Sequence, residues 1–163
     1  LNIPNEVIAQ FLKTTKALEH RLENFFLKKN TLFVNDSKGT NVESTVKAIE
    51  AFKNKVVLIA GGENKKICND ELIKKINERV GFVYLIGETG TILAEEMDKV
   101  GYKKYKNLGT LEKVLLDIRE NIDFEDGQTI LFSPATASFD QFKNFEERGR
   151  IFKELTNKIL GEK

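Results

Sequence analysis

The residues from Ser133 to Gly149 are the part of this chain whose types and spacing most clearly suggest chemistry. They follow the apolar stretch 129–132, which is typical of a buried strand, and are predicted to open the last helix. A helix N-terminus leaves backbone N–H groups unpaired at the positive end of the dipole, where a carboxylate or phosphate can bind. Ser138, followed by Gln141, predicts a capping box at this end. The run alone is equally compatible with a plain tight turn.

A second polar loop, residues 35–41, also follows an apolar stretch. Asp36 and Lys38 place opposite charges at the tip of the predicted strand. Thr40, followed by Glu43, predicts another capping box and therefore another helix start. The alternative is a side-chain-stabilised turn that carries a solvated lysine.

A third polar loop, residues 61–66, follows the apolar stretch 56–60. Two glycines open it, and Lys65 supplies positive charge. The chain contains no run of Gly, four residues and Gly-Lys-Ser/Thr, so this loop is not a P-loop. A lone Gly-Gly-x-x-Lys is more often a turn than a binding site.

The elements that must position these loops alternate between strand and helix. Runs of Val, Ile, Leu and Phe are typical of parallel strands that are covered on both faces. The pattern predicts strands at 56–60, 82–86 and 128–132, and helices at 70–79, 91–100 and 110–119. We therefore expect an α/β fold, a three-layer Rossmann-like sandwich with a mostly parallel sheet.

The two ends of the chain complete this expectation. Near the N-terminus, an amphipathic helix is expected at 7–15, and residues 18–27 form a strand that pairs through the turn 28–30 with 31–34, an antiparallel hairpin at the edge of the sheet. The last helix is expected to bury a stripe of Phe142, Phe145, Phe152, Leu155 and Ile159. Phe139 lies instead beside the candidate anion site.

In an open parallel sheet, ligands bind outside the carboxyl ends of the strands. All three polar loops follow strands directly, so the fold would bring them to the same edge. Asp36, Lys38, Lys65 and the helix start at Ser138 would then lie close together. This predicts a site for an anion or a nucleotide at that edge.

Composition limits the other possibilities. The 163 residues include 26 basic and 25 acidic side chains, so net charge +1 gives no general attraction to nucleic acid or to anionic lipid. No apolar stretch is long enough to span a bilayer, and no signal peptide is visible, which together with the single cysteine, Cys68, favours a cytoplasmic location. With His20 as the only histidine, no metal-ligand set is expected. The start at Leu1 suggests a piece of a longer protein.

Several motifs occur in the order seen in Mur ligases, and the chain resembles the carboxy-terminal part of that family. They are His20-Arg21-x-Glu23, Asn35-Asp36-Ser37-Lys38-Gly39-Thr40-Asn41, Gly61-Gly62 with Lys65, Ser133-Pro134-Ala135, Ser138-Phe139-Asp140 and Phe145-Glu146-x-Arg148-Gly149. Two elements favour the branch that adds D-glutamate: Asp36-Ser37-Lys38-x-Thr40-Asn41 and Ser133-Pro134-Ala135-x-Ala137-Ser138-x-Asp140-x-Phe142. The resemblance implies that residues 1–15 are the last helix of a central ATPase domain, 16–18 a hinge, and 19–163 the amino-acid-binding domain.

The resemblance also implies a reaction and its participants. ATP with Mg²⁺ would activate the carboxylate of UDP-N-acetylmuramoyl-L-alanine as an acyl phosphate, and the amine of D-glutamate would attack it. The N-terminal and central domains of the same chain would be partners of this domain, in a protein expected to be a monomer.

Site residues carry over from the family motifs by position. Arg21 would contact the ATP phosphates, and Asp36 would hold the ribose. Lys38 and Lys65 would be catalytic, with Lys38 adding positive potential near the transferred phosphate. The residues around D-glutamate would be Thr40, Lys65, Ser138, Phe139 and Phe145. His20 is as compatible with a packed strand residue as with a participant.

Two departures and three alternatives remain open. The sequence Glu63-Asn64-Lys65-Lys66 differs from the family, which usually has Asp before the lysine and a small residue after it. The P-loop and the magnesium ligands of the family have no counterpart here, so the chain alone is expected to catalyse nothing. The alternatives are another Mur ligase, a folylpolyglutamate synthase, or a free-standing α/β nucleotide-binding module.

Overall fold

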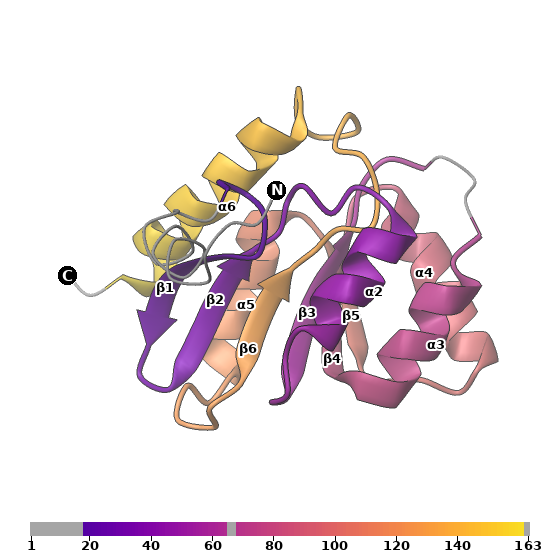
Figure 1. Cartoon of the computed structure of the whole chain (residues 1–163), viewed down its shortest axis with the longest axis horizontal. Coiled ribbons are helices and arrows are strands. Elements are labelled where there is room, and N and C mark those ends of the chain that lie inside the picture. The colour runs from indigo at the N-terminus through magenta and orange to yellow at the C-terminus, as the bar shows by residue number, and fades with distance from the viewer. Residues whose placement is uncertain (1–17, 65–67, 162–163) are drawn as a thin grey trace, which may run out of the picture.

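The computed structural model describes residues 18–64 and 68–161, which form a mixed sheet flanked by helices (Figure 1). The strand order is β1-β2-β6-β3-β4-β5. β1 pairs antiparallel with β2, and the other neighbours are parallel. The strands are β1 (Glu23–Lys28), β2 (Thr31–Asn35), β3 (Val56–Gly61), β4 (Val80–Ile86), β5 (Tyr105–Gly109) and β6 (Thr129–Phe132). The predicted α/β sandwich with an antiparallel edge is confirmed.

Helices cover both faces of this sheet (Figure 1). They are α2 (Val42–Glu50), α3 (Asp70–Arg79), α4 (Thr89–Lys99), α5 (Leu111–Asn121) and α6 (Phe145–Leu160). The first three pack in one apolar cluster with residues such as Leu58 and Leu131, and the last two in another with Ile59 and Phe132. Neighbouring residues of β3 and β6 thus point into opposite layers, which is why these strands are apolar throughout.

The N-terminal hairpin begins later than predicted. Its first strand starts at Glu23 and not at Leu18, because the chain turns at His20 and Leu22, whose φ angles are 64° and 43°. Strand β5 was missed altogether. It lies at the far edge of the sheet and contains Lys106 and Asn107, so it lacks the apolar run of a central strand.

Both predicted capping boxes are wrong. Helix α6 begins at Phe145, and its N-cap is Asn144, whose side chain accepts a hydrogen bond from the backbone of Glu147. The residues from Ser138 onward form turns instead, and the Gln141 side chain donates to the carbonyl of Gly109. The helix dipole therefore does not end at Ser138.

The N-cap of α2 also differs from the predicted residue. Asn41, one residue after Thr40, accepts the hydrogen bond from the backbone of Ser44. In the last helix, Phe152 and its neighbours Leu155 and Ile159 do pack on the sheet, and Phe142 joins them from the preceding turn.

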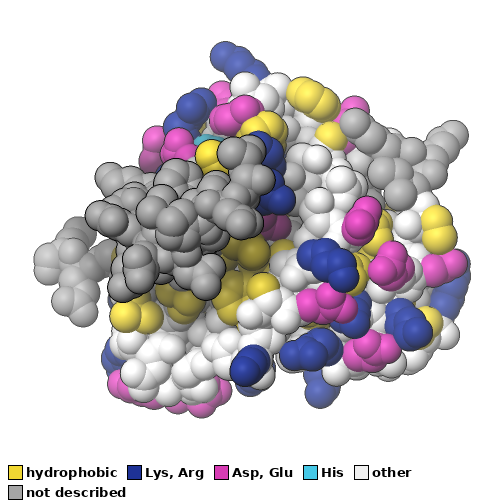
Figure 2. Space-filling view, in the orientation of Figure 1, with side chains coloured by type: hydrophobic (Ala, Val, Ile, Leu, Met, Phe, Trp, Pro, Cys, Tyr) yellow, Lys and Arg dark blue, Asp and Glu magenta, His cyan; other side chains and the backbone are white. Residues whose placement is uncertain are grey.

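The predicted domain boundary falls largely outside the described residues. The described residues do not include the expected terminal helix 1–15, and of the hinge 16–18 they include only the last residue. Among the described residues, no helix combines the length and the apolar character needed to cross a membrane. In Figure 2, acidic and basic side chains alternate over the face that carries α2 and α3, in keeping with the nearly balanced composition.

Candidate functional site

Three polar loops meet at the carboxyl edge of the sheet. The loop after β6 lies between the other two, because β6 pairs with both β2 and β3. Backbone N–H groups join them: Ala135 donates to Gly39 at 2.9 Å, Gly61 donates to Pro134 at 2.8 Å, and Glu63 donates to Ala137 at 3.0 Å. The loops therefore form one continuous rim.

Asp36 is buried in this rim. One carboxylate oxygen accepts from the Ser133 hydroxyl at 2.7 Å, and the other accepts from the backbone N–H of Leu22 at 3.2 Å. A side chain at Gly39 would lie 2.6 Å from both the Asp36 carboxylate and the Ser133 hydroxyl, so glycine is required there. Burial raises the pKa of Asp36, against the opposing effect of these two hydrogen bonds.

A pocket of about 410 Å³ opens beside Asp36. Its wall includes Arg21, Lys38, Ser44 in the first turn of α2 and Lys47 in the last turn of that helix. Cationic side chains together with the first turn of a helix suit a phosphate group. The residues expected to bind the nucleotide, Arg21 and Asp36, thus line one pocket together with Lys38.

The residues expected around D-glutamate are less closely grouped. Thr40 and Phe145 are half-buried, Ser138 is buried, and Phe139 is 63% exposed on a shallow pocket of about 520 Å³. Lys65 lies outside the described residues. The Lys38 ammonium stands 5.7 Å from the centre of the Phe145 ring, which links this group to the first pocket.

Two buried oxygens of the rim, Thr136 Oγ1 and Asp140 Oδ1, have no hydrogen-bond partner among the described residues. The other Asp140 oxygen accepts from the backbone N–H of Glu88 at 3.2 Å. Burial raises the pKa of Asp140.

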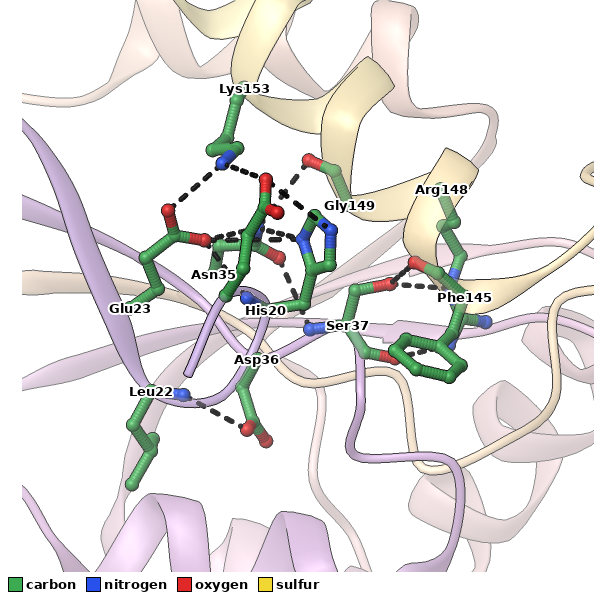
Figure 3. Close-up of polar contacts among 11 residues, drawn as sticks. His20, Leu22, Glu23, Asn35, Asp36, Ser37, Phe145, Arg148, Gly149 and Lys153 are labelled. Carbon is green, nitrogen blue, oxygen red and sulfur yellow. Dashed lines mark hydrogen bonds and ion pairs between the residues drawn. The ribbon is translucent and has the colours of Figure 1, made fainter. Parts of the chain in front are cut away.

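His20 belongs to a buried network behind the rim (Figure 3). The backbone N–H of Ser37 donates to Asn35 Oδ1 at 3.2 Å, which fixes the orientation of that amide. Asn35 Nδ2 therefore donates to His20 Nδ1 at 2.9 Å, and the neutral ring carries its proton on Nε2. Desolvation lowers the pKa of His20, so the neutral ring is favoured.

A metal ion does not suit this network. Glu19, His20 and Glu23 bring three potential ligands together, but the Lys153 ammonium already lies 2.8 Å and 2.9 Å from the two carboxylates. The protonated Nε2 of His20 also has no lone pair for a metal. We assign the cluster to structure: its lysine ties the start of β1, at Glu23, to α6 (Figure 3).

Arg148 belongs to a family motif, but its own role was not predicted from the sequence. It is fully buried, and its guanidinium donates to the Ser37 hydroxyl and carbonyl (Figure 3). It also donates to the Thr136 carbonyl. A signal was available: an arginine between Phe145 and Phe152, at helical spacing, lies on the apolar stripe of its helix.

Comparisons with known proteins agree with this architecture. The family model described as Mur ligase, glutamate ligase domain, matches residues 20–136. A UDP-N-acetylmuramoylalanine–D-glutamate ligase of Fusobacterium nucleatum is 44% identical over 163 residues, which are 99% of this chain and 38% of that protein. One of the same name from Caldicellulosiruptor bescii is 38% identical over 97% of this chain and 34% of its own length. The chain thus spans little more than a third of these relatives.

Solved structures show the same fold at lower identity. A bifunctional folylpolyglutamate synthase/dihydrofolate synthase from Yersinia pestis has a TM-score of 0.64 at 18% identity, over 95% of this chain and 35% of that one. A MurF ligase from Thermotoga maritima, in complex with ADP, has a TM-score of 0.54 at 17% identity, over 93% and 36%.

Proposed function

Because the glutamate ligase domain model of Mur ligases matches residues 20–136, this chain belongs to the Mur ligase family, and we propose that it is the carboxy-terminal domain of an ATP-dependent ligase that adds D-glutamate to UDP-N-acetylmuramoyl-L-alanine. The reaction is a step of peptidoglycan synthesis in the cytoplasm. The joining of three strand-end loops into one rim is the observation that carries the proposal. Relatives that cover nearly the whole chain bear this ligase name.

The proposed division of labour follows the two ends of the rim. Arg21 binds the phosphates of ATP and Asp36 binds its ribose, in the pocket that these residues share with Lys38. The residues that bind D-glutamate are Thr40, Lys65, Ser138, Phe139 and Phe145. A dianionic amino acid requires cations and fixed donors, and each charge-assisted hydrogen bond contributes about 1.5–3 kcal/mol.

The chemistry requires the rest of the ligase. ATP and Mg²⁺ would be held mainly by the central domain, where the acyl phosphate of the UDP-linked substrate would form. This chain would present the amine of D-glutamate to that acyl group, with Lys38 and Lys65 offsetting negative charge as phosphate leaves. Both the orientation of the amine and the neutralisation of charge lower the barrier to such a transfer.

The test is substrate kinetics in the complete ligase. We expect Lys65→Ala to raise the KM for D-glutamate at least about tenfold, by loss of one charge-assisted hydrogen bond, and to change the KM for ATP less than about twofold. Lys74→Ala removes an exposed lysine from α3 and is the matched control. An equal loss for both substrates would assign Lys65 to the wrong ligand.

A folylpolyglutamate synthase is the second candidate, since one such structure has the TM-score of 0.64. Another, titled with Mn, AMPPNP and L-glutamate bound, has 0.62. The two candidate functions differ in the enantiomer of glutamate that is added and in the acceptor that receives it. Ligation of D-glutamate to UDP-N-acetylmuramoyl-L-alanine supports our proposal, whereas use of L-glutamate with a folate acceptor refutes it.

A further inference from the structure

Arg148 contacts all three loops of the rim at once. Nε donates to the Ser37 hydroxyl at 3.1 Å, and Nη2 donates to the Ser37 carbonyl at 2.9 Å. Nη1 donates to the Thr136 carbonyl at 3.1 Å. A Cβ at Gly62 would lie 3.2 Å from Nη1, so the third loop packs directly on the guanidinium. Few single side chains could join three segments, and the planar fork of arginine suits the task.

The contacts continue from Arg148 to the expected ligand residues. Ser37 stands between Asp36 and Lys38 in the chain, and its hydroxyl donates to the Phe145 carbonyl at 2.8 Å. Thr136 lies two residues before Ser138. The guanidinium carbon is 5.9 Å from the centre of the Phe132 ring, which closes the site from the sheet side. The nucleotide side and the amino-acid side therefore share one buried support.

The charge of this support is not neutralised locally. Among residues 18–64 and 68–161, no carboxylate forms an ion pair with Arg148, and Asp140 acts on it only through its electrostatic field. Desolvation lowers the pKa of Arg148 to about 10, which still leaves it protonated at neutral pH. A buried charge without a partner is costly, and an anion bound nearby reduces that cost.

We propose that Arg148 is a positioning residue of the ligase, which holds the three loops in register and whose buried positive charge is balanced by the acidic amino acid bound at the rim. This inference rests on the proposed function and adds a determinant of specificity: a neutral amino acid would leave the guanidinium uncompensated. Arg148 acts through Ser37, Gly62 and Thr136 and does not itself touch the reacting atoms.

The first experiment compares charge and shape in the complete ligase. Arg148→Met removes the charge and should raise the KM for D-glutamate at least about tenfold, whereas Arg148→Lys keeps the charge but loses the planar fork, so its KM should lie between those of the wild type and Arg148→Met. Arg150→Met, an exposed position on the same helix, controls for surface charge. Phe152→Leu, a buried position without bonds to the loops, controls for lost packing and should lower the melting temperature without changing the KM.

A second experiment needs only the lysine variant to fold. Burial lowers the pKa of an amine, so the ammonium of Arg148→Lys should lose its proton at a pH below the ordinary lysine value of about 10.4. The ratio of its KM for D-glutamate to that of the wild type should therefore rise with pH. The titratable side chains on the described parts of the three loops include Asp36, Lys38, Glu63, Asp140 and Lys143. Both enzymes carry the same loops, so the ratio removes their contribution.

The outcomes separate this inference from the proposed function. A wild-type KM in Arg148→Met, or a ratio for Arg148→Lys that does not change with pH, overturns the charge-balancing role while the ligase assignment stands. If the complete protein does not ligate D-glutamate at all, the proposed function itself fails, and that is seen with the wild type before any variant is made.

Discussion

Asp36 shows a conflict between stability and binding at the level of one residue. Its carboxylate is buried, and its only described partners are the Ser133 hydroxyl and the Leu22 N–H. Burial raises its pKa above the ordinary value of 3.8, so the folded protein holds this proton more tightly than the unfolded chain does. The carboxylate therefore lowers the stability of the fold as pH rises from about 4 through the raised pKa.

We expect Asp36→Asn to remove the loss of stability that accompanies ionisation of this carboxyl group. At neutral pH the variant should be at least as stable as the wild type, and below about pH 4 the difference should vanish or reverse. The KM for ATP should rise about tenfold, since an amide replaces a charged acceptor for the ribose, while the KM for D-glutamate changes little. Thermal unfolding against pH, with kinetics of the complete ligase, tests both parts. An unchanged KM for ATP would remove Asp36 from the nucleotide site.

At the level of elements, the start of α6 depends on Asn144 and not on Ser138. Asn144→Ala should lower the free energy of unfolding by about 0.5–2 kcal/mol, because the backbone N–H of Glu147 loses its acceptor. Ser138→Ala should leave the stability nearly unchanged and raise the KM for D-glutamate. Denaturant unfolding and kinetics of the two variants measure this. A large loss of stability in Ser138→Ala alone would restore the capping role that the sequence suggested.

The same element explains why an acidic ligand would still be favoured at the rim. The helix dipole ends at Asn144, several residues beyond Ser138. The positive end of a helix is therefore not what would attract an anion to Ser138. The buried guanidinium of Arg148, in the first turn of α6, supplies positive charge at this edge instead.

At the level of the whole molecule, the sheet brings loops from distant parts of the chain to one edge. The loops come from β2, β3 and β6, and the strand order places β6 between the other two. We expect the purified 163-residue chain to catalyse neither ligation nor ATP hydrolysis, because phosphoryl transfer needs a phosphate-binding loop and metal that a partner domain would provide. Phosphate release by this chain, compared with the complete ligase, is the measurement. Activity at the rate of the complete ligase would contradict the domain assignment.

The sequence predicted the repeating framework well, because buried parallel strands must be apolar and amphipathic helices must be periodic. Helix α3 was located at both ends from its pattern alone, and β3 was located to within a residue. It missed β5, whose exposed edge gives no such pattern. Caps were misplaced by one residue at α2 and by six at α6, since Ser, Thr and Asn all suit the role and only the path of the loop selects one of them.

The order of motifs along the chain was by itself enough to indicate the family, because those side chains and glycines recur wherever the same ligand and the same turns are needed. The tertiary structure alone decided how they cooperate. Arg148 was visible in the sequence only as one letter in a motif, yet folding buries it against Ser37, Gly62 and Thr136. Contacts between residues more than a hundred positions apart follow from strand order and packing, which local patterns do not encode.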